Sequence, residues 1–166
     1  MHAIEIWLET YIQHYGIVAY FFILYFESLG LPLPGESGLV VGSLLAAAGK
    51  LSLPGLLLAC FLGSVLGDCT GYAIGHFGGK NLLLRYGYLI KLTPERLDKF
   101  ENQLNQKGFF FVATARFIVI ARQLNGIIAG SGGMTFHKFL AANIIGSAAW
   151  TLVWGAGPYI VKVFFS

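Results

Sequence analysis

The chain has 166 residues, of which 56% are hydrophobic and only 11% are charged, and its mean hydropathy is +0.69. Soluble domains carry about 25% charged residues, so this composition excludes an ordinary water-soluble enzyme and indicates a membrane protein. The net charge of +3 is small and dispersed, which argues against a nucleic-acid partner. The His and Cys spacings are not typical of a metal site, and no cofactor is expected.

The N-terminal part predicts a surface helix followed by a short apolar helix. Residues 1–14 mix apolar and polar side chains in a pattern typical of an amphipathic helix that lies in the membrane interface. Residues 17–27 are strongly apolar, but as a helix with a rise of 1.5 Å per residue they span only about 16 Å. This length reaches about halfway through a ~30 Å hydrocarbon core, so the chain is expected to turn there.

A helix-breaking segment follows this short run. Pro32 and Pro34 remove backbone donors, and Gly35 favours a turn, before a second short apolar run at residues 37–49. Two half-length helices around a break predict a re-entrant hairpin. Irregular backbone at membrane depth is tolerated only inside protein or beside water, so the break also predicts a polar cavity.

Residues 56–76 predict a longer helix that carries a row of glycines. The glycines recur at four-residue intervals, at Gly63, Gly67, Gly71, Gly75 and Gly79. Such a row forms a smooth stripe along a helix where another backbone can approach closely, so we interpret it as helix packing, within the chain or between copies in a homo-oligomer. Asp68 lies beside this stripe, where an unpaired carboxylate at membrane depth would be costly.

Residues 80–107 are the one segment expected to face water. Six basic side chains stand there against three acidic ones, and residues 94–106 predict a short surface helix that begins with a proline. The basic excess favours the cytoplasmic side of the membrane.

From residue 108 the earlier pattern repeats. A short aromatic run leads to a polar interruption that contains Arg116 and Arg122, and a brief apolar piece follows at residues 127–129. This pattern predicts a second re-entrant hairpin. Residues 139–161 then form the one uncharged run that is comfortably long enough to span the membrane.

The expected fold is an all-α membrane protein with a single domain over residues 1–166. An interfacial helix at 1–14 precedes a first half at 17–77, and the surface segment at 80–107 separates it from a second half at 108–161. Each half is a re-entrant hairpin followed by a spanning helix. With one spanning helix between them, the hairpins enter from opposite faces and their tips meet near the midplane, in the inverted-repeat arrangement that transporters use.

Four charges fall at the two breaks, namely Glu27, Glu36, Arg116 and Arg122. On insertion scales each costs at least about 2.5–3.5 kcal/mol at the bilayer centre, so they must be paired or hydrated. One interpretation is that two buried salt bridges hold the hairpins together. The other is a functional site, in which two guanidiniums bind a phosphate or carboxylate and the acids exchange protons or compete for the arginines. Asn125 could bind the same headgroup or satisfy the loop backbone.

An ordered set of short motifs resembles the DedA family, the bacterial branch of the group that contains the SNARE-associated or VTT domain. The motifs are Phe26-Glu27-Ser28, Pro34-Gly35-Glu36, Gly63 through Gly67-Asp68 to Tyr72, Arg116-Phe117 followed by Arg122, Ala129-Gly130, Met134, Phe139, and Asn143 with Gly146 and Trp150. Many relatives have proline where this chain has Val119. The resemblance implies a multi-pass protein of the bacterial inner membrane that recycles undecaprenyl phosphate or moves related phospholipids.

The resemblance also implies that the functional acids correspond to Glu27 and Glu36, and the functional arginines to Arg116 and Arg122. We therefore expect a proton-coupled lipid transporter, not an enzyme, with membrane lipid and protons as its partners. The expected site residues are Arg116, Arg122 and Asn125 for the phosphate and Glu27, Glu36 and Asp68 for proton coupling. The alternatives are a proton-coupled cation antiporter, an intramembrane lipid-phosphate hydrolase and a purely structural membrane protein.

Overall fold

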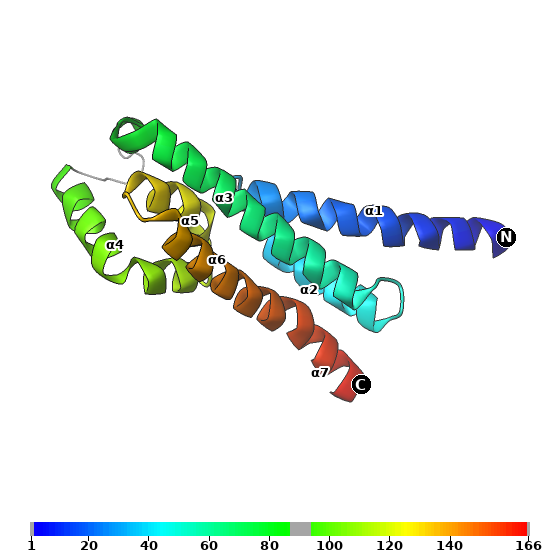
Figure 1. Cartoon of the computed structure of the whole chain (residues 1–166). Coiled ribbons are helices and arrows are strands. Elements are labelled where there is room, and N and C mark those ends of the chain that lie inside the picture. Colours follow the sequence, from blue (N-terminus) through cyan, green and yellow to red (C-terminus); the bar gives the residue numbers. More distant parts are fainter. Residues whose placement is uncertain (1, 87–93, 166) are drawn as a thin grey trace.

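A computed structural model describes residues 2–86 and 94–165 of the chain, and over these residues it contains helices and no strand. Their bounds are α1 His2–Ser28, α2 Gly35–Ala47, α3 Leu53–Tyr86, α4 Pro94–Ala115, α5 Val119–Ser131, α6 Phe136–Thr151, the π-helical turn η2 Leu152–Ala156, and α7 Gly157–Phe165. Figure 1 shows an elongated bundle in which α4 and α5 lie at one end, while α1 begins and α7 ends toward the other. The predicted all-α fold class is confirmed.

Two helical stretches in the described part are long and apolar enough to cross a membrane. They are Leu53–Gly78, with 26 residues and a mean hydropathy of 1.6, and Phe136–Phe165, with 30 residues and a mean hydropathy of 1.4. Two further apolar helical stretches, Tyr15–Ser28 and Gly35–Ala47, are shorter. These lengths agree with the prediction that α1 and α2 each contain only a short apolar segment.

The second candidate span is interrupted by a π turn. Within η2 the backbone widens, and the N–H of Gly157 bonds to the carbonyl of Leu152, five residues earlier. Pro158 follows directly and has no N–H to continue an α-helical ladder. The chain therefore continues from α6 through η2 into α7 without ending the helix, and it exceeds the uncharged run 139–161 at both ends.

The first part of the glycine row packs against α1. A Cβ atom on Gly63 would lie 2.3 Å from the carbonyl oxygen of Phe21, and one on Gly67 would lie 2.4 Å from that of Tyr25. Real Cβ atoms do not approach backbone this closely, so any larger residue would push α1 away from α3. These two glycines are therefore used for packing within the chain.

The second part of the row packs against α5, where the contact is reciprocal. A Cβ on Gly75 would lie 2.2 Å from the carbonyl oxygen of Ile127, and a Cβ on Gly126 would lie 2.2 Å from that of Asp68. Gly71 faces the same helix with more room, because its Cβ would be 3.5 Å from Ile127. The glycine row of α3 thus packs against α1 along its first part and against α5 along its second part.

Two predicted boundaries differ from the structure. The predicted interfacial segment 1–14 and the apolar run 17–27 belong to one continuous helix, α1, since only a single glycine and no proline stands between them. The predicted surface helix 94–106 continues to Ala115 as α4. Of the predicted water-facing segment, residues 87–93 lie outside the described residues.

The second break is shorter than predicted. Only residues 116–118 separate α4 from α5, so Arg122 and Asn125 lie within α5 and not in an extended polar interruption. Arginine and glutamine are good helix formers, and Val119 stands where a proline would have shaped the turn. The predicted brief apolar piece 127–129 is the second half of the same helix.

Candidate functional site

The first break brings two carboxylates to facing helix ends. Glu27 lies in the last turn of α1 and is buried, with 2% of its surface exposed, whereas the Glu36 side chain, at the start of α2, is 36% exposed. Gly35 lies against the Glu27 carboxylate, because a Cβ there would be 1.9 Å from Oε2. Only glycine at this position leaves room for Glu27 to reach the start of α2.

Arg122 meets both carboxylates from α5. Its Nη2 donates a hydrogen bond of 2.6 Å to Oε1 of Glu27, and its Nη1 lies 3.7 Å from Oε2 of Glu36. The guanidinium carbon is 4.8 Å from the centroid of the Trp150 ring. Nε and Nη1 have no hydrogen-bond partner among the described residues. Arg122 is therefore held by one hydrogen bond and by the face of the Trp150 ring, while the N–H groups of Nε and Nη1 have no acceptor among the described residues.

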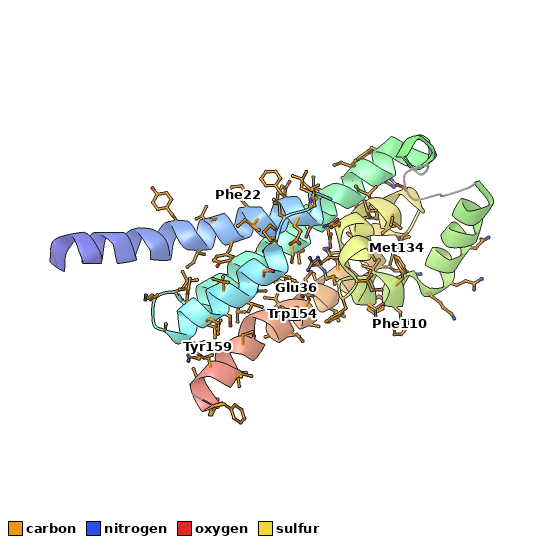
Figure 2. The ribbon with its side chains drawn as sticks, turned by 180° about the vertical axis from the view of Figure 1, so that it is seen from behind. Phe22, Glu36, Phe110, Met134, Trp154 and Tyr159 are labelled. Carbon is orange, nitrogen blue, oxygen red and sulfur yellow. The ribbon has the colours of Figure 1, made fainter. Side chains whose placement is uncertain are left out.

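An open pocket of about 470 Å³ lies over this group. Its lining residues come from the first break and from α5, namely Glu27, Pro32, Leu33, Pro34, Glu36, Ser37, Arg122 and Gln123. Figure 2 shows Glu36 near the middle of the bundle's length, where α2 begins. The predicted polar cavity at the first break is thus present, and it contains both predicted acids and one of the two predicted arginines.

Arg116 has a different environment. Its Nη2 bonds to the Asp68 carboxylate, to Oδ1 of Asn143 at 2.8 Å and to the carbonyl oxygen of Ser64 at 3.3 Å. Arg116, Asp68 and Asn143 are each at most 1% exposed, and none of them lines the open pocket. The expectation that both arginines hold one phosphate is therefore not matched by the geometry, because Arg116 is enclosed between α3 and α6.

The open group carries an excess of negative charge. With Arg122 facing Glu27 and Glu36, one guanidinium stands against two carboxylates, so the group is negative by one charge when all three are ionised. An anion in the pocket would compete with both carboxylates for Arg122. Protonation of a carboxylate would remove that competition.

Asn125 is not in the pocket. Its side chain is fully buried, and Nδ2 donates to the carbonyl oxygen of Val112 at 3.1 Å, which ties α5 to α4. Of the two alternatives for this residue, the structure favours backbone satisfaction over headgroup binding. Gln123, its neighbour in α5, lines the pocket instead.

Two partners of the arginines were not assigned to the site from the sequence. Asn143 bonds to Arg116 and also donates to the carbonyl oxygen of Val65 at 3.2 Å, so it joins α6 to α3. Only 1% of the surface of Trp150 is exposed, and its ring lies beside Arg122. The only signal in the sequence was that both residues sit in the same motif of the resemblance.

The VTT domain family matches residues 33–157 of the chain. An uncharacterized membrane protein of Synechocystis is 38% identical over 146 residues, which cover 88% of this chain and 67% of the relative. Protein DedA of Escherichia coli is 29% identical over 164 residues, covering 94% of this chain and 74% of that protein. A Lactococcus lactis protein called alkaline phosphatase-like is 29% identical over 158 residues, covering 92% and 72%.

The fold and the charged helix breaks are those of an integral membrane protein, and the family match covers most of the chain. The chain belongs to the DedA family of VTT-domain membrane proteins. No solved structure matches it significantly.

Proposed function

We propose that the protein moves a lipid with a phosphate headgroup across the inner membrane, with undecaprenyl phosphate or a related phospholipid as the substrate. The observation that carries this proposal is the open pocket lined by Arg122, whose buried Nε and Nη1 have no hydrogen-bond partner among the described residues. A guanidinium presents a planar fork that fits two phosphate oxygens at once. The apolar tail never has to leave hydrocarbon, so only the headgroup needs a polar route.

Proton coupling follows from the charge of the pocket. Glu27 and Glu36 occupy Arg122 when they are ionised, and they release it when they take up protons. A phosphate therefore binds in exchange for Glu27, and the return of the carboxylate on deprotonation expels it. In this scheme Glu27 and Glu36 are the coupling acids and Gln123 is a second headgroup contact.

The packing of the helices supports an inverted repeat of two re-entrant hairpins. The second arm of the first hairpin, α2, packs against η2 and α7, which belong to the second candidate span. The second arm of the other hairpin, α5, packs against α3, which contains the first candidate span. The second helix of each hairpin thus packs against the candidate span of the other half, as expected when two hairpins enter a membrane from opposite faces.

Arg116 and Asp68 have a scaffolding role in this proposal. They join the α4–α5 turn to the middle of α3, and Asn143 adds α6 to the same group. A removal of either charge would leave the other buried without compensation. A structural salt bridge therefore accounts for Arg116 and Asp68, while Arg122 with Glu27 and Glu36 forms the transport site.

Two alternative activities each have one observation in their favour. The name alkaline phosphatase-like, given to the Lactococcus relatives, favours a lipid-phosphate hydrolase. The net negative charge of the pocket favours a proton-coupled cation antiporter. A hydrolase releases inorganic phosphate, and an antiporter moves cations without any lipid phosphate.

The proposal is tested with the full chain in vesicles that contain a fluorescent short-chain polyprenyl phosphate in one leaflet. We expect the unsubstituted protein to move the lipid to the other leaflet, and Arg122→Gln to reduce the rate to that of empty vesicles. Lys50→Gln is the matched control, since Lys50 is an exposed cation in the turn between α2 and α3.

Three readouts from the same vesicles separate the candidates. Lipid movement that depends on Arg122, without release of inorganic phosphate, supports the transporter. Release of inorganic phosphate would replace it with the hydrolase. Cation flux in vesicles that lack the phosphate lipid, together with no lipid movement, would replace it with the antiporter.

A further inference from the structure

Trp150 is the bulkiest fully buried side chain in the described part of the protein. The guanidinium carbon of Arg122 lies 4.8 Å from the centroid of its ring. A cation within about 6 Å of an aromatic centroid is attracted by the ring, most strongly when both groups are shielded from water. The contact joins α6, in the second candidate span, to α5 in the hairpin that carries the pocket arginine.

The ring is fixed by the core of the first half. It packs in a cluster with Leu24 of α1, Leu39 of α2 and Leu56 of α3. Its position is therefore set by three helices that do not include α5. A side chain held in this way can act as a rigid support for a mobile guanidinium.

A ring face supports Arg122 without using its hydrogen-bond donors. Of the three guanidinium nitrogens, only Nη2 is engaged in a hydrogen bond, to Glu27, while Nε and Nη1 have none among the described residues. Buried donors without acceptors are normally costly and call for a physical reason. A carbonyl or carboxylate in place of the ring could have bound one of these donors, whereas a ring face binds neither.

We propose that Trp150 is a positioning residue that holds the Arg122 guanidinium beside the pocket by its π face, without forming a hydrogen bond to Nε or Nη1, so that the guanidinium is placed to bind phosphate oxygens. This inference rests on the proposed function, because it assigns the ring a part in binding the lipid phosphate. A tryptophan that only filled the core would contribute its volume and nothing through its electrons. The two roles differ in their response to the electron density of the ring.

Successive ring fluorination tests this difference. Fluorine withdraws electrons from the ring and weakens a cation–π contact with little change in shape. The full chain is made by cell-free synthesis with tryptophan or its mono- to tetrafluorinated forms at position 150 only, and a short-chain polyprenyl phosphate is the probe in lipid nanodiscs. We expect its affinity to fall with each fluorine, by about tenfold over the series.

The same substitutions at Trp154 are the matched control. Trp154 lies in η2 on the same span and is half-buried against the same core cluster, but it does not touch the guanidinium. We expect no trend in affinity there. A flat affinity across the position 150 series, while the unsubstituted protein binds the lipid, would overturn the inference and leave the proposed function intact.

A second measurement reads the contact without any lipid. The ¹⁹F signal of 5-fluorotryptophan at position 150 is expected to shift when Arg122 becomes glutamine, and the same label at Trp154 is expected to stay in place. Absence of a shift at position 150 would contradict the ring contact itself. A failure of the unsubstituted protein to bind polyprenyl phosphate would overturn the proposed function, and the phosphate role of the ring with it.

Discussion

The two arginines that the sequence treats alike occupy different sites. Arg116 is enclosed with Asp68 and Asn143 between α3 and α6. Arg122 is almost as buried, but it borders an open pocket and faces two carboxylates, of which Glu36 is partly exposed. One guanidinium is matched by one carboxylate and an amide, and the other by two carboxylates that outnumber it.

This difference separates a sealed pair, Arg116 with Asp68, from an open pair, Arg122 with Glu27, in which the arginine can exchange partners. A sealed pair has no route for a ligand, and its separation would leave two uncompensated charges in the interior. The open pair has space beside it and a carboxylate that water can reach, whereas Nε and Nη1 lack partners among the described residues in both arginines. The cost of placing a charge in a membrane thus identifies residues that need an explanation. Whether a ligand can reach a residue decides if that residue can bind a substrate.

The largest expected effect is on stability, at the sealed pair. Asp68→Asn leaves the Arg116 charge without its counter-ion and should lower the free energy of unfolding by about 3–5 kcal/mol. Glu36→Gln should change it by no more than about 1 kcal/mol, because Glu36 is partly exposed and 3.7 Å from Arg122. Unfolding in mixed micelles titrated with SDS measures both. Equal losses from the two variants would contradict the distinction between sealed and open pairs.

The next largest effect is a loss of stability at the contact between α3 and α5. Gly75→Ala should destabilise the protein by about 1–3 kcal/mol, because its Cβ would meet the Ile127 carbonyl at 2.2 Å. Gly71→Ala, one turn away on the same face, should be nearly neutral, since its Cβ would make an ordinary contact at 3.5 Å. The same SDS titration compares them. Equal losses of stability in the two variants would contradict this difference between Gly71 and Gly75.

The smallest expected effect is the pH dependence of lipid binding at the open pair. Protonation of Glu27 frees Arg122, so the affinity for polyprenyl phosphate should rise as pH falls, by at most about tenfold per pH unit for one proton. The rise should level off near about pH 6, where a phosphate monoester takes up its own second proton. Glu27→Gln should flatten the profile, and Lys50→Gln should keep it. Affinity that falls with decreasing pH would reverse the proposed exchange.

The sequence predicted the helical class and the first break because both depend on local chemistry. Pro32 and Pro34 stop a helix wherever they occur, and the chain does turn there. The second break was overestimated, since Arg122 and Asn125 are compatible with a helix and lie inside α5. Polarity alone does not interrupt a helix whose side chains find partners.

The pairing of charges could not be predicted, because it depends on how distant helices meet. Asp68 had no partner in the sequence-based interpretation, yet it lies opposite Arg116, 48 residues away. Trp150, 28 residues from Arg122 in the sequence, lies beside its guanidinium in the interior. The insertion cost pointed to charges that the structure pairs, whereas their division into two groups needed the packing of α5 against α3 and α1.

The most direct test of the account compares two double variants in which each pair is replaced by neutral side chains of similar size. We predict that Asp68→Asn with Arg116→Gln remains folded and moves polyprenyl phosphate within several-fold of the unsubstituted rate. Glu27→Gln with Arg122→Gln should also fold, but should move the lipid no faster than empty vesicles. The account is contradicted if the second double variant transports the lipid at the unsubstituted rate while the first, correctly folded, does not.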